Sequence, residues 1–284
     1  MHELPIGDGS LEAVLLPEAG ARLHRLRAFG HDLLRTPPDT AEHLRNPFFW
    51  GGYLMAPWCN RLAARTTAVG GRTVALASNF PDGSAIHGQV HAMAWSVTGV
   101  TTCSVRAGGD GWPWPYEVSL AAEERDTALS LRWQLTNLAD EPMPAGIGFH
   151  PWWCRPVRVR VDAGLVYPSN VTPTANPRPV TGPLDLRAGG FPADGLDGTW
   201  TDVSVPRVEL AWPELGVVAT MAASVGARFV AMATPPGLDA IAVEPQTHAP
   251  DGLRRLLDGR ADGLAWLPAG DALTLELEIQ VERG

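Results

Sequence analysis

Lysine is absent from this chain of 284 residues, so all 22 residues of the Lys and Arg class are arginines. An arginine guanidinium stays protonated, and it can neither form a Schiff base nor act as a nucleophile. The absence of lysine therefore excludes Schiff-base aldolases, pyridoxal phosphate enzymes and P-loop nucleotidases, because each of them needs a lysine amine.

Long apolar runs and paired cysteines are missing as well. No stretch of about 18 consecutive apolar residues occurs, so we expect no membrane-spanning helix. The first residues, MHELPIGDGSLEAVLLPE, contain no basic region followed by an apolar stretch, which speaks against a secretory signal. Cys59, Cys103 and Cys154 are odd in number and form no CxxC pair. We therefore expect reduced thiols in a cytoplasmic protein, without a disulfide framework or a metal site.

Positive charge is also scarce. The chain has 31 acidic residues against 22 arginines, which gives a formal net charge of −9. Binding to nucleic acid depends on a cationic surface that displaces the counterions of the phosphates. The composition offers no such surface, so nucleic acid is not an expected partner.

Period-two patterns are the main structural signal in the sequence. Apolar and polar residues alternate over 129–136, 157–161 and 273–282, which is typical of half-buried antiparallel strands. Helical periodicity occurs only in short pieces such as 253–257, too short for the crossover helices of a Rossmann or TIM fold. The sequence thus predicts one all-β domain over residues 1–284, a large antiparallel β-sandwich. Further strands are expected near 11–16, 73–77, 95–100, 116–120, 208–212, 217–221, 229–233 and 240–243.

Three short segments hold the residues best suited to chemistry. APWCNR over 56–61 is followed by AIHGQVH, which ends at His91; GIGFHPWW contains His150; and AIAVEPQ contains Glu244. A histidine before Gly or Pro is often only the cap of a turn. Glu244 directly follows an apolar strand, where a charge without a partner is costly, so this carboxylate is expected to be paired or functional.

Taken in order, these motifs resemble the aldose 1-epimerase (galactose mutarotase) family. The resemblance rests on Pro57-Trp58-Cys59-Asn60-Arg61, Ile86-His87-Gly88, Gly148-Phe149-His150-Pro151, Val243-Glu244-Pro245, and the segment 182–187 followed by Leu196-Asp197. It implies a galactose mutarotase-like supersandwich and an isomerase that interconverts the α and β anomers of a free aldose.

The resemblance also implies roles for individual residues. Glu244 would be the general base and His150 the general acid, and His87 could share the acid role. Arg61 and Asp197 would hold sugar hydroxyls, with further contacts from Asn60, His91 and Trp152. Trp58 and Trp153 are additional candidates for a ring that stacks on the sugar, although tryptophan more often packs in a core.

The chemistry of this reaction agrees with the residues available. Ring opening needs one group that accepts the proton of the C1 hydroxyl and another that donates a proton to the ring oxygen. Neither step needs a cofactor or a metal, so none is expected, and the expected partner is a small-molecule sugar.

Three other functions compare with this one: two stay open, and a glycosidase fits poorly because the acid partner here is expected to be a histidine. A hexose-6-phosphate 1-epimerase would use an arginine cluster, for which Arg61 and Arg65 are candidates. A carbohydrate-binding module without turnover would not need Glu244 and His150, and a glycosidase would need two carboxylates. The sequence decides neither the preferred sugar nor the oligomeric state, and a homodimer is among the options.

Overall fold

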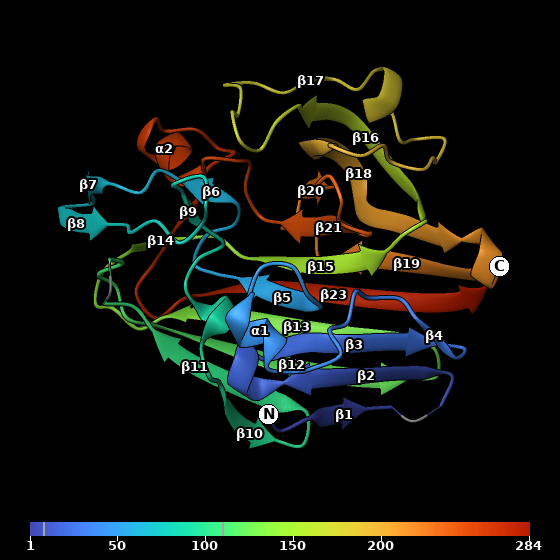
Figure 1. The fold of residues 1–284 in the computed structure, drawn as a ribbon. Helices are drawn as coiled ribbons and strands as arrows, with labels where there is room; N and C mark the ends of the chain where they lie inside the picture. The colour runs from blue at the N-terminus through green and yellow to red at the C-terminus, as the bar shows by residue number, and fades with distance from the viewer. Residues whose placement is uncertain (8, 110) are drawn as a thin grey trace.

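The computed structural model describes residues 1–7, 9–109 and 111–284, and it is built almost entirely of strands (Figure 1). The α-helices in this part of the chain are α1 (Glu42–Arg45) and α2 (Gly252–Leu257). Single 3-10 turns lie at Pro17–Ala19, Val90–Ala92, Gly182–Leu184 and Pro213–Leu215. None of the described helices is long and apolar enough to cross a membrane. The all-β class and the short helix near 253–257 were both predicted from the sequence.

One sheet carries the elements that matter most for the site. Its strands are all antiparallel and pair in the order β1, β2, β3, β5, β15, β21, β20, β18 and β16. Their bounds are Leu4–Ile6 (β1), Leu11–Leu16 (β2), Arg22–Ala28 (β3), Gly52–Met55 (β5), Gly148–Cys154 (β15), Ala240–Gln246 (β21), Phe229–Ala233 (β20), Asp197–Trp212 (β18) and Arg158–Tyr167 (β16). Two short strands, β4 (His31–Asp32) and β17 (Arg178–Pro179), add to β3 and β16.

The second sheet packs against the first and pairs in the order β10, β11, β12, β13, β23, β19 and β18. Its strands are β10 (Ser96–Gly99), β11 (Thr102–Ala107), β12 (Tyr116–Arg125), β13 (Ala128–Asn137), β23 (Ala272–Arg283) and β19 (Val217–Ala223). Three pairs of short strands lie outside both sheets: the hairpin of β7 (Thr66–Val69) and β8 (Arg72–Ala75), and the non-consecutive pairs β6 (Arg61–Leu62) with β9 (Ala85–Ile86) and β14 (Met143–Ala145) with β22 (Ala265–Leu267).

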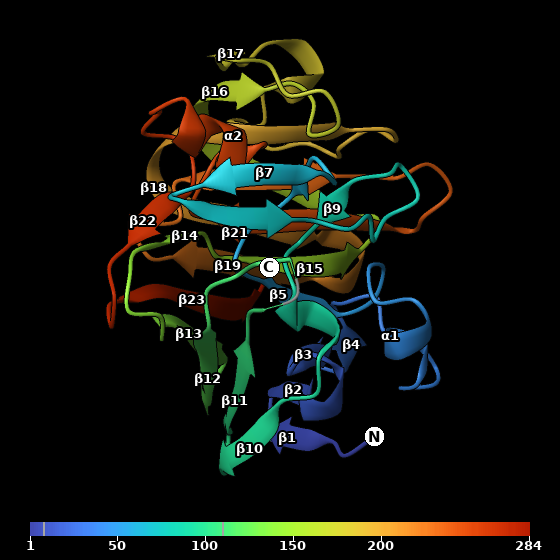
Figure 2. The same cartoon turned by 90° about the vertical axis from the view of Figure 1, so that its left-hand side faces the viewer.

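The long strand β18 belongs to both sheets. Its first residues pair with β20 and its last residues pair with β19, while β16 follows it on the other side. The free edges of the two sheets, β1 and β10, lie side by side at the opposite end of the molecule, as the two perpendicular views show (Figures 1 and 2). The sandwich is therefore open at one end and joined by shared strands at the other.

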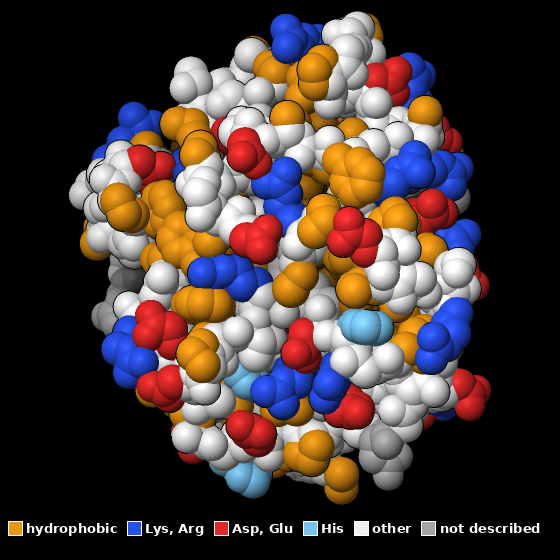
Figure 3. All heavy atoms as spheres, turned by 45° about the vertical axis from the view of Figure 1, so that its right-hand side comes forward, with side chains coloured by type: hydrophobic (Ala, Val, Ile, Leu, Met, Phe, Trp, Pro, Cys, Tyr) orange, Lys and Arg blue, Asp and Glu red, His pale blue; other side chains and the backbone are white. Residues whose placement is uncertain are grey.

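Alternation along the strands places the core between the two sheets. In β13 the apolar residues Leu129, Leu131 and Leu135 are buried, whereas the intervening Ser130 and Arg132 are exposed. The predicted strands at 129–136, 157–161 and 273–282 are confirmed in β13, β16 and β23. On the face shown in Figure 3, arginine and acidic side chains are interspersed, and the described residues there form no continuous basic patch.

Strands β15 and β21 extend beyond the positions expected from the sequence. A histidine before proline often caps a turn, and Glu244 was expected directly after a strand, yet His150 lies inside β15 and Glu244 inside β21. Both strands are buried on both faces, so they show no alternation that would mark their ends. Trp153 lies in the core, as does Trp58, so neither is a platform for a sugar.

Candidate active site

The register of three neighbouring strands brings the central residues together. His150 on β15 pairs with Tyr53 on β5, and the register between β15 and β21 places it opposite Glu244. Side chains of directly opposite residues point to the same face of a sheet. Tyr53, His150 and Glu244 therefore stand in one row on the face that turns away from the sandwich core.

Two hydrogen bonds between Asn60 and His87 hold the His87 side chain beside this row. The backbone N–H of Asn60 donates to Nδ1 of His87 at 3.2 Å, and the backbone N–H of His87 donates to the carbonyl of Asn60 at 3.1 Å. Both residues have positive φ angles, 56° and 60°. Gly88 follows with a φ of 73°, and a Cβ there would lie 1.9 Å from the carbonyl oxygen of Ala56. The His-Gly motif therefore reflects backbone geometry that only glycine fits.

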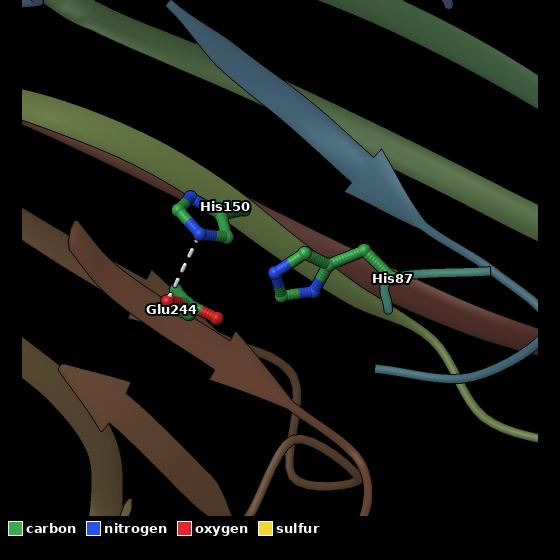
Figure 4. Close-up of side chains that lie close together, drawn as sticks. All are labelled: His87, His150 and Glu244. Carbon is green, nitrogen blue, oxygen red and sulfur yellow. Dashed lines mark ion pairs between the residues drawn. The ribbon is translucent and has the colours of Figure 1, made fainter. Parts of the chain in front are cut away.

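Figure 4 shows how the three side chains face one another. Nε2 of His150 lies 3.2 Å from Oε1 of Glu244, and Nε2 of His87 points toward both groups. Each of the three residues is at most 5% exposed. The site thus brings two imidazole rings and one carboxyl group close together, and all three are buried.

Burial sets the protonation of the central pair. It raises the pKa of Glu244 to about 8, with a further increase from Asp197 that Arg61 opposes. Burial lowers the pKa of His150 to about 3, and Arg22 contributes to the decrease. At neutral pH the ligand-free pair therefore holds one proton, on Glu244, and Nε2 of His150 accepts the hydrogen bond. A general base and a general acid would need an ionised Glu244 and a protonated His150. That state is reached when one proton moves from Glu244 to Nε2 of His150 across their contact of 3.2 Å.

His87 has a different character. Burial holds its pKa well below the ordinary value, and the nearby His150 adds to this effect. Because Nδ1 already accepts a hydrogen bond from Asn60, the proton of the neutral ring is on Nε2, the atom that faces the cavity. His87 is therefore a neutral hydrogen-bond donor at the site.

The proton on Nε2 of His87 also limits metal binding at this site. The ligand atoms of His87, His150 and Glu244 lie within 4.8 Å of one another, and two histidines with a carboxylate form a set that zinc accepts. Nε2 of His87 carries a proton, however, and so has no lone pair to give to a metal. Only two ligands remain, fewer than the three protein ligands that catalytic zinc sites use.

These residues line a narrow cavity of about 80 Å³. Seven of the eight residues predicted from the sequence line it: Glu244, His150, His87, Arg61, Asp197, Asn60 and Trp152. The sequence analysis did not find the other lining residues, among them Phe48, Tyr53, Phe80 and Asn170. No chemical motif marks these four, because each contributes through its place in the fold.

The polar walls of the cavity are held by neighbouring groups. Nε of Arg61 donates to Asp82 at 2.6 Å, and its guanidinium lies over the ring of Phe80. Asp197, the first residue of β18, accepts hydrogen bonds from the backbone N–H of Asn170 at 3.0 Å and from its side-chain amide at 2.8 Å. Both predicted hydroxyl-binding residues are thus fixed in place.

The remaining predicted residues differ in their positions. Trp152 lies against the ring of His150 with a centroid distance of 5.0 Å, and its indole N–H donates to the carbonyl of Phe48 at 2.6 Å. His91 is buried outside the cavity lining and packs against Phe48 and Tyr53. The structure therefore brings Trp152 to the cavity but does not bring His91 there.

Buried Arg22 explains how the wall behind His150 is kept in position. Its guanidinium lies 4.6 Å from the ring centre of Tyr53, which stacks on His150 at 4.5 Å. The same group donates to the carbonyls of Pro47 and Trp50, at either end of the segment that contains Phe48. One arginine therefore supports both the stacking partner of His150 and the rim of the cavity.

Comparisons with known proteins agree with this arrangement. The family described as Aldose 1-epimerase matches residues 3–191. A galactose mutarotase-like protein from Clostridium acetobutylicum superposes with a TM-score of 0.85 at 17% identity, covering 99% of this chain and 95% of the other. An aldose epimerase homologue from C. elegans gives 0.82 at 18% identity, covering 99% of each chain.

A galactose 1-epimerase from Lactobacillus acidophilus gives a TM-score of 0.76 at 14% identity and covers 98% of this chain and 93% of the other. No curated protein matches by sequence. At these identities the structural likenesses establish the fold, and the family match comes from the sequence.

Proposed function

This chain belongs to the aldose 1-epimerase family, and on that premise we propose that it interconverts the α and β anomers of a free aldose in the cavity around Glu244 and His150. The observation that supports the proposal most strongly is the buried contact of 3.2 Å between these two side chains. A pair that shares one proton has both an acceptor and a donor, which are the two groups that ring opening requires.

The proton balance of the reaction suits such a pair. With its proton on His150, the pair takes the C1 hydroxyl proton on Glu244 while His150 protonates the ring oxygen. The ring opens to the aldehyde, the C1–C2 bond rotates, and the reverse transfers close the ring as the other anomer. The pair returns to its starting state with the same number of protons. Each positioned acid or base contributes about 10²–10⁴-fold to such a rate.

The other lining groups suit a bound sugar. Neutral His87 can donate a fixed hydrogen bond from Nε2 to an oxygen near the reacting centre. Arg61 and Asp197 offer a donor and an acceptor to the remaining hydroxyls, and Trp152 presents an apolar ring to the C–H face of the sugar. These residues are proposed to act on binding and orientation.

A phosphorylated substrate has less support. Among the described residues that line the cavity, Arg61 is the one arginine, and it is already paired with Asp82. Arg65 lines a separate hollow with Thr67 and Arg254. A phosphate would therefore meet no arginine cluster, so a neutral aldose is the better candidate.

Polarimetry of freshly dissolved α-D-glucose and α-D-galactose tests the proposal. We expect wild-type protein to accelerate equilibration, and Glu244→Gln to lose about 10²-fold or more of the rate while keeping its fold and sugar binding, because the amide cannot exchange a proton. Glu209→Gln, the same change at an exposed position of β18, is the matched control and should leave the rate unchanged.

Two results would contradict this assignment. Turnover close to wild type in Glu244→Gln would remove Glu244 from the chemistry. Sugar binding without acceleration by wild-type protein would favour a binding module instead.

A further inference from the structure

His248 is a fully buried histidine that has no part in the proposed reaction and does not line the cavity. It lies two residues after the end of β21. Its Nδ1 lies 2.8 Å from the carbonyl oxygen of Ala249, and its Nε2 lies 3.0 Å from the backbone nitrogen of Cys59. The ring therefore connects the end of β21 to the turn around Cys59, although the two are 189 positions apart in the sequence.

These two contacts define the tautomer of His248. A backbone carbonyl only accepts hydrogen bonds, so Nδ1 carries the proton and donates it to Ala249. Nε2 keeps its lone pair and accepts from the N–H of Cys59. Burial lowers the pKa of His248 to about 4, so the ring is neutral at neutral pH and retains this acceptor.

Two glycines form the slot that holds the ring of His248. A Cβ at Gly146 would lie 2.3 Å from Cδ2 of the ring, and a Cβ at Gly252 would lie 2.4 Å from Nδ1. Neither glycine has a φ in the left-handed region, so the close approach of the ring is what requires glycine at both positions. The ring is thus held in place by the backbone of two separate segments.

The turn that includes Cys59 has three successive N–H groups that donate to side chains. The N–H of Cys59 donates to His248. The N–H of Asn60 donates to Nδ1 of His87 at 3.2 Å, and the N–H of Arg61 donates to Oδ1 of Asn60 at 2.9 Å. Because each peptide unit is rigid, the direction of one N–H constrains the direction of the next. His248 and His87 therefore hold neighbouring peptide groups of the same turn.

The contact from Asn60 leaves the proton of His87 on Nε2, the atom that faces the cavity. Cys59 is fully buried, so its N–H would be left without a partner if His248 lost its acceptor. An unpaired buried N–H is costly, and we expect the turn to rotate toward another acceptor. Nδ1 of His87 would then lose its donor and be free to carry the proton itself.

We propose that His248 is a positioning residue, which holds the turn at Cys59 and Asn60 so that His87 keeps its proton on Nε2. Its effect on the rate rests on the proposed epimerase function, in which His87 donates to an oxygen near the reacting centre. Its effect on the tautomer of His87 does not depend on that function.

Two amide substitutions separate the contacts of the ring. The amide oxygen of Gln stands as far from the backbone as Nε2, so His248→Gln can still accept from Cys59. The amide of Asn stands as far from the backbone as Nδ1, so His248→Asn can still donate to Ala249 but has no acceptor for Cys59. Both amides are flat and no larger than an imidazole, so both fit between Gly146 and Gly252.

Heteronuclear NMR that correlates the ring nitrogens with the ring protons reports the tautomer of His87, and His87→Asn serves to assign its signals. We expect a bare Nδ1 and a protonated Nε2 in wild-type protein and in His248→Gln, and a mixture of both tautomers in His248→Asn. His2→Asn, the same change at an exposed position, is the matched control and should leave the spectrum of His87 unchanged.

Polarimetry with glucose provides the second measurement. We expect kcat/KM to stay close to wild type in His248→Gln and to fall about tenfold in His248→Asn, as the loss of one hydrogen bond predicts. If wild-type protein turns over no sugar, the epimerase proposal is wrong, and the tautomer of His87 alone decides the role of His248.

A purely structural role of His248 predicts a different outcome. His248→Asn would then unfold at a lower urea concentration while His87 kept its proton on Nε2, and this result would overturn the inference. Equal mixtures of tautomers in His248→Gln and His248→Asn would overturn it too, because the acceptor for Cys59 would then make no difference. His248→Met, whose flexible side chain fills the slot without a strong acceptor, replaces His248→Asn if that variant does not fold.

Discussion

Burial sets the protonation of the residues around the cavity more strongly than the neighbouring charges do. It is the largest cause of the lowered pKa values of His87, His91 and His150 and of the raised pKa of Glu244. In each case burial favours the neutral form. The buried residues His87, His150 and Glu244 are therefore uncharged in the ligand-free protein, and in the proposed reaction charge develops within the pair that moves a proton.

The pH dependence of the rate should reveal this pair. The one-proton state exists between the pKa of about 3 for His150 and the pKa of about 8 for Glu244. We expect kcat/KM to stay level through neutral pH and to fall above about 8, where Glu244 loses its proton and the pair has none to donate. Initial rates by polarimetry from pH 5 to 10, corrected for spontaneous mutarotation, provide the measurement. A fall that begins near the ordinary histidine pKa of about 6.5 would show that His150 titrates as if solvated.

At the scale of single residues, sequence reasoning found the groups that we propose to react but not those that support them. Glu244 and His150 stand in recognisable motifs, and the cost of burying a carboxylate marks Glu244 independently. Tyr53 lies in a short apolar strand, and Asn170 lies in a loop far from Asp197 in sequence. Their contacts with His150 and Asp197 depend on strand register and loop packing, which no local pattern records.

Among the elements, strands with one solvated face were predictable and strands buried on both faces were not. β13 and β23 alternate clearly, whereas β5 and β15 have nearly every residue buried. The strands of the site belong to the second kind, because one face meets the core and the other meets the cavity. This explains why the strand predicted near 240–243 stopped short of Glu244, which lies inside β21.

Gly88, which lies two residues after the end of β9, offers a prediction about backbone geometry. Gly88→Ala forces an alanine into a φ of 73° and brings its Cβ against the carbonyl of Ala56, so the contact between His87 and Asn60 should be displaced. Gly30→Ala is the matched control, since its φ of 88° is also positive but no atom lies within 4 Å of the added Cβ.

Urea unfolding and polarimetry distinguish the two variants. Gly30→Ala should lose about 1–2 kcal/mol of stability, the cost of a left-handed alanine, and retain its rate. Gly88→Ala should lose more stability and most of the rate as well. Equal losses in both would mean that the close approach to Ala56 is relieved without disturbing His87.

At the scale of the whole molecule, six of the eight histidines have pKa values lowered mainly by burial: His24, His43, His87, His91, His150 and His248. Each of them binds a proton more readily in the unfolded chain than in the folded one. Stability is therefore lost as the pH falls below about 6.5, by about 1.4 kcal/mol per pH unit for each proton taken up. Glu244, whose pKa is raised, offsets one of these protons between its ordinary value and about 8.

Thermal unfolding over a pH series tests this expectation. The Tm should fall from about pH 6.5 to pH 5, as the unfolded chain takes up more protons on its histidines than Glu244 offsets. The net charge alone predicts the opposite, because the chain of charge −9 approaches its isoelectric point near 5.3 over the same range and its self-repulsion decreases. A Tm maximum near pH 5.3 would show that repulsion outweighs the buried histidines.

The sharing of β18 between the two sheets limits how the protein can move. A hinge between two packed sheets needs a boundary that hydrogen bonds do not cross, and here the ladders of β16 and β18 continue from one sheet into the other. We therefore expect the two sheets to move together as one rigid body. The segments that carry Phe48 and Phe80 lie outside both sheets. If the narrow cavity widens, we expect these two segments to move. We therefore expect entry and release of the proposed sugar substrate to depend on these rim loops, with the floor that carries Glu244 and His150 held by the sheet.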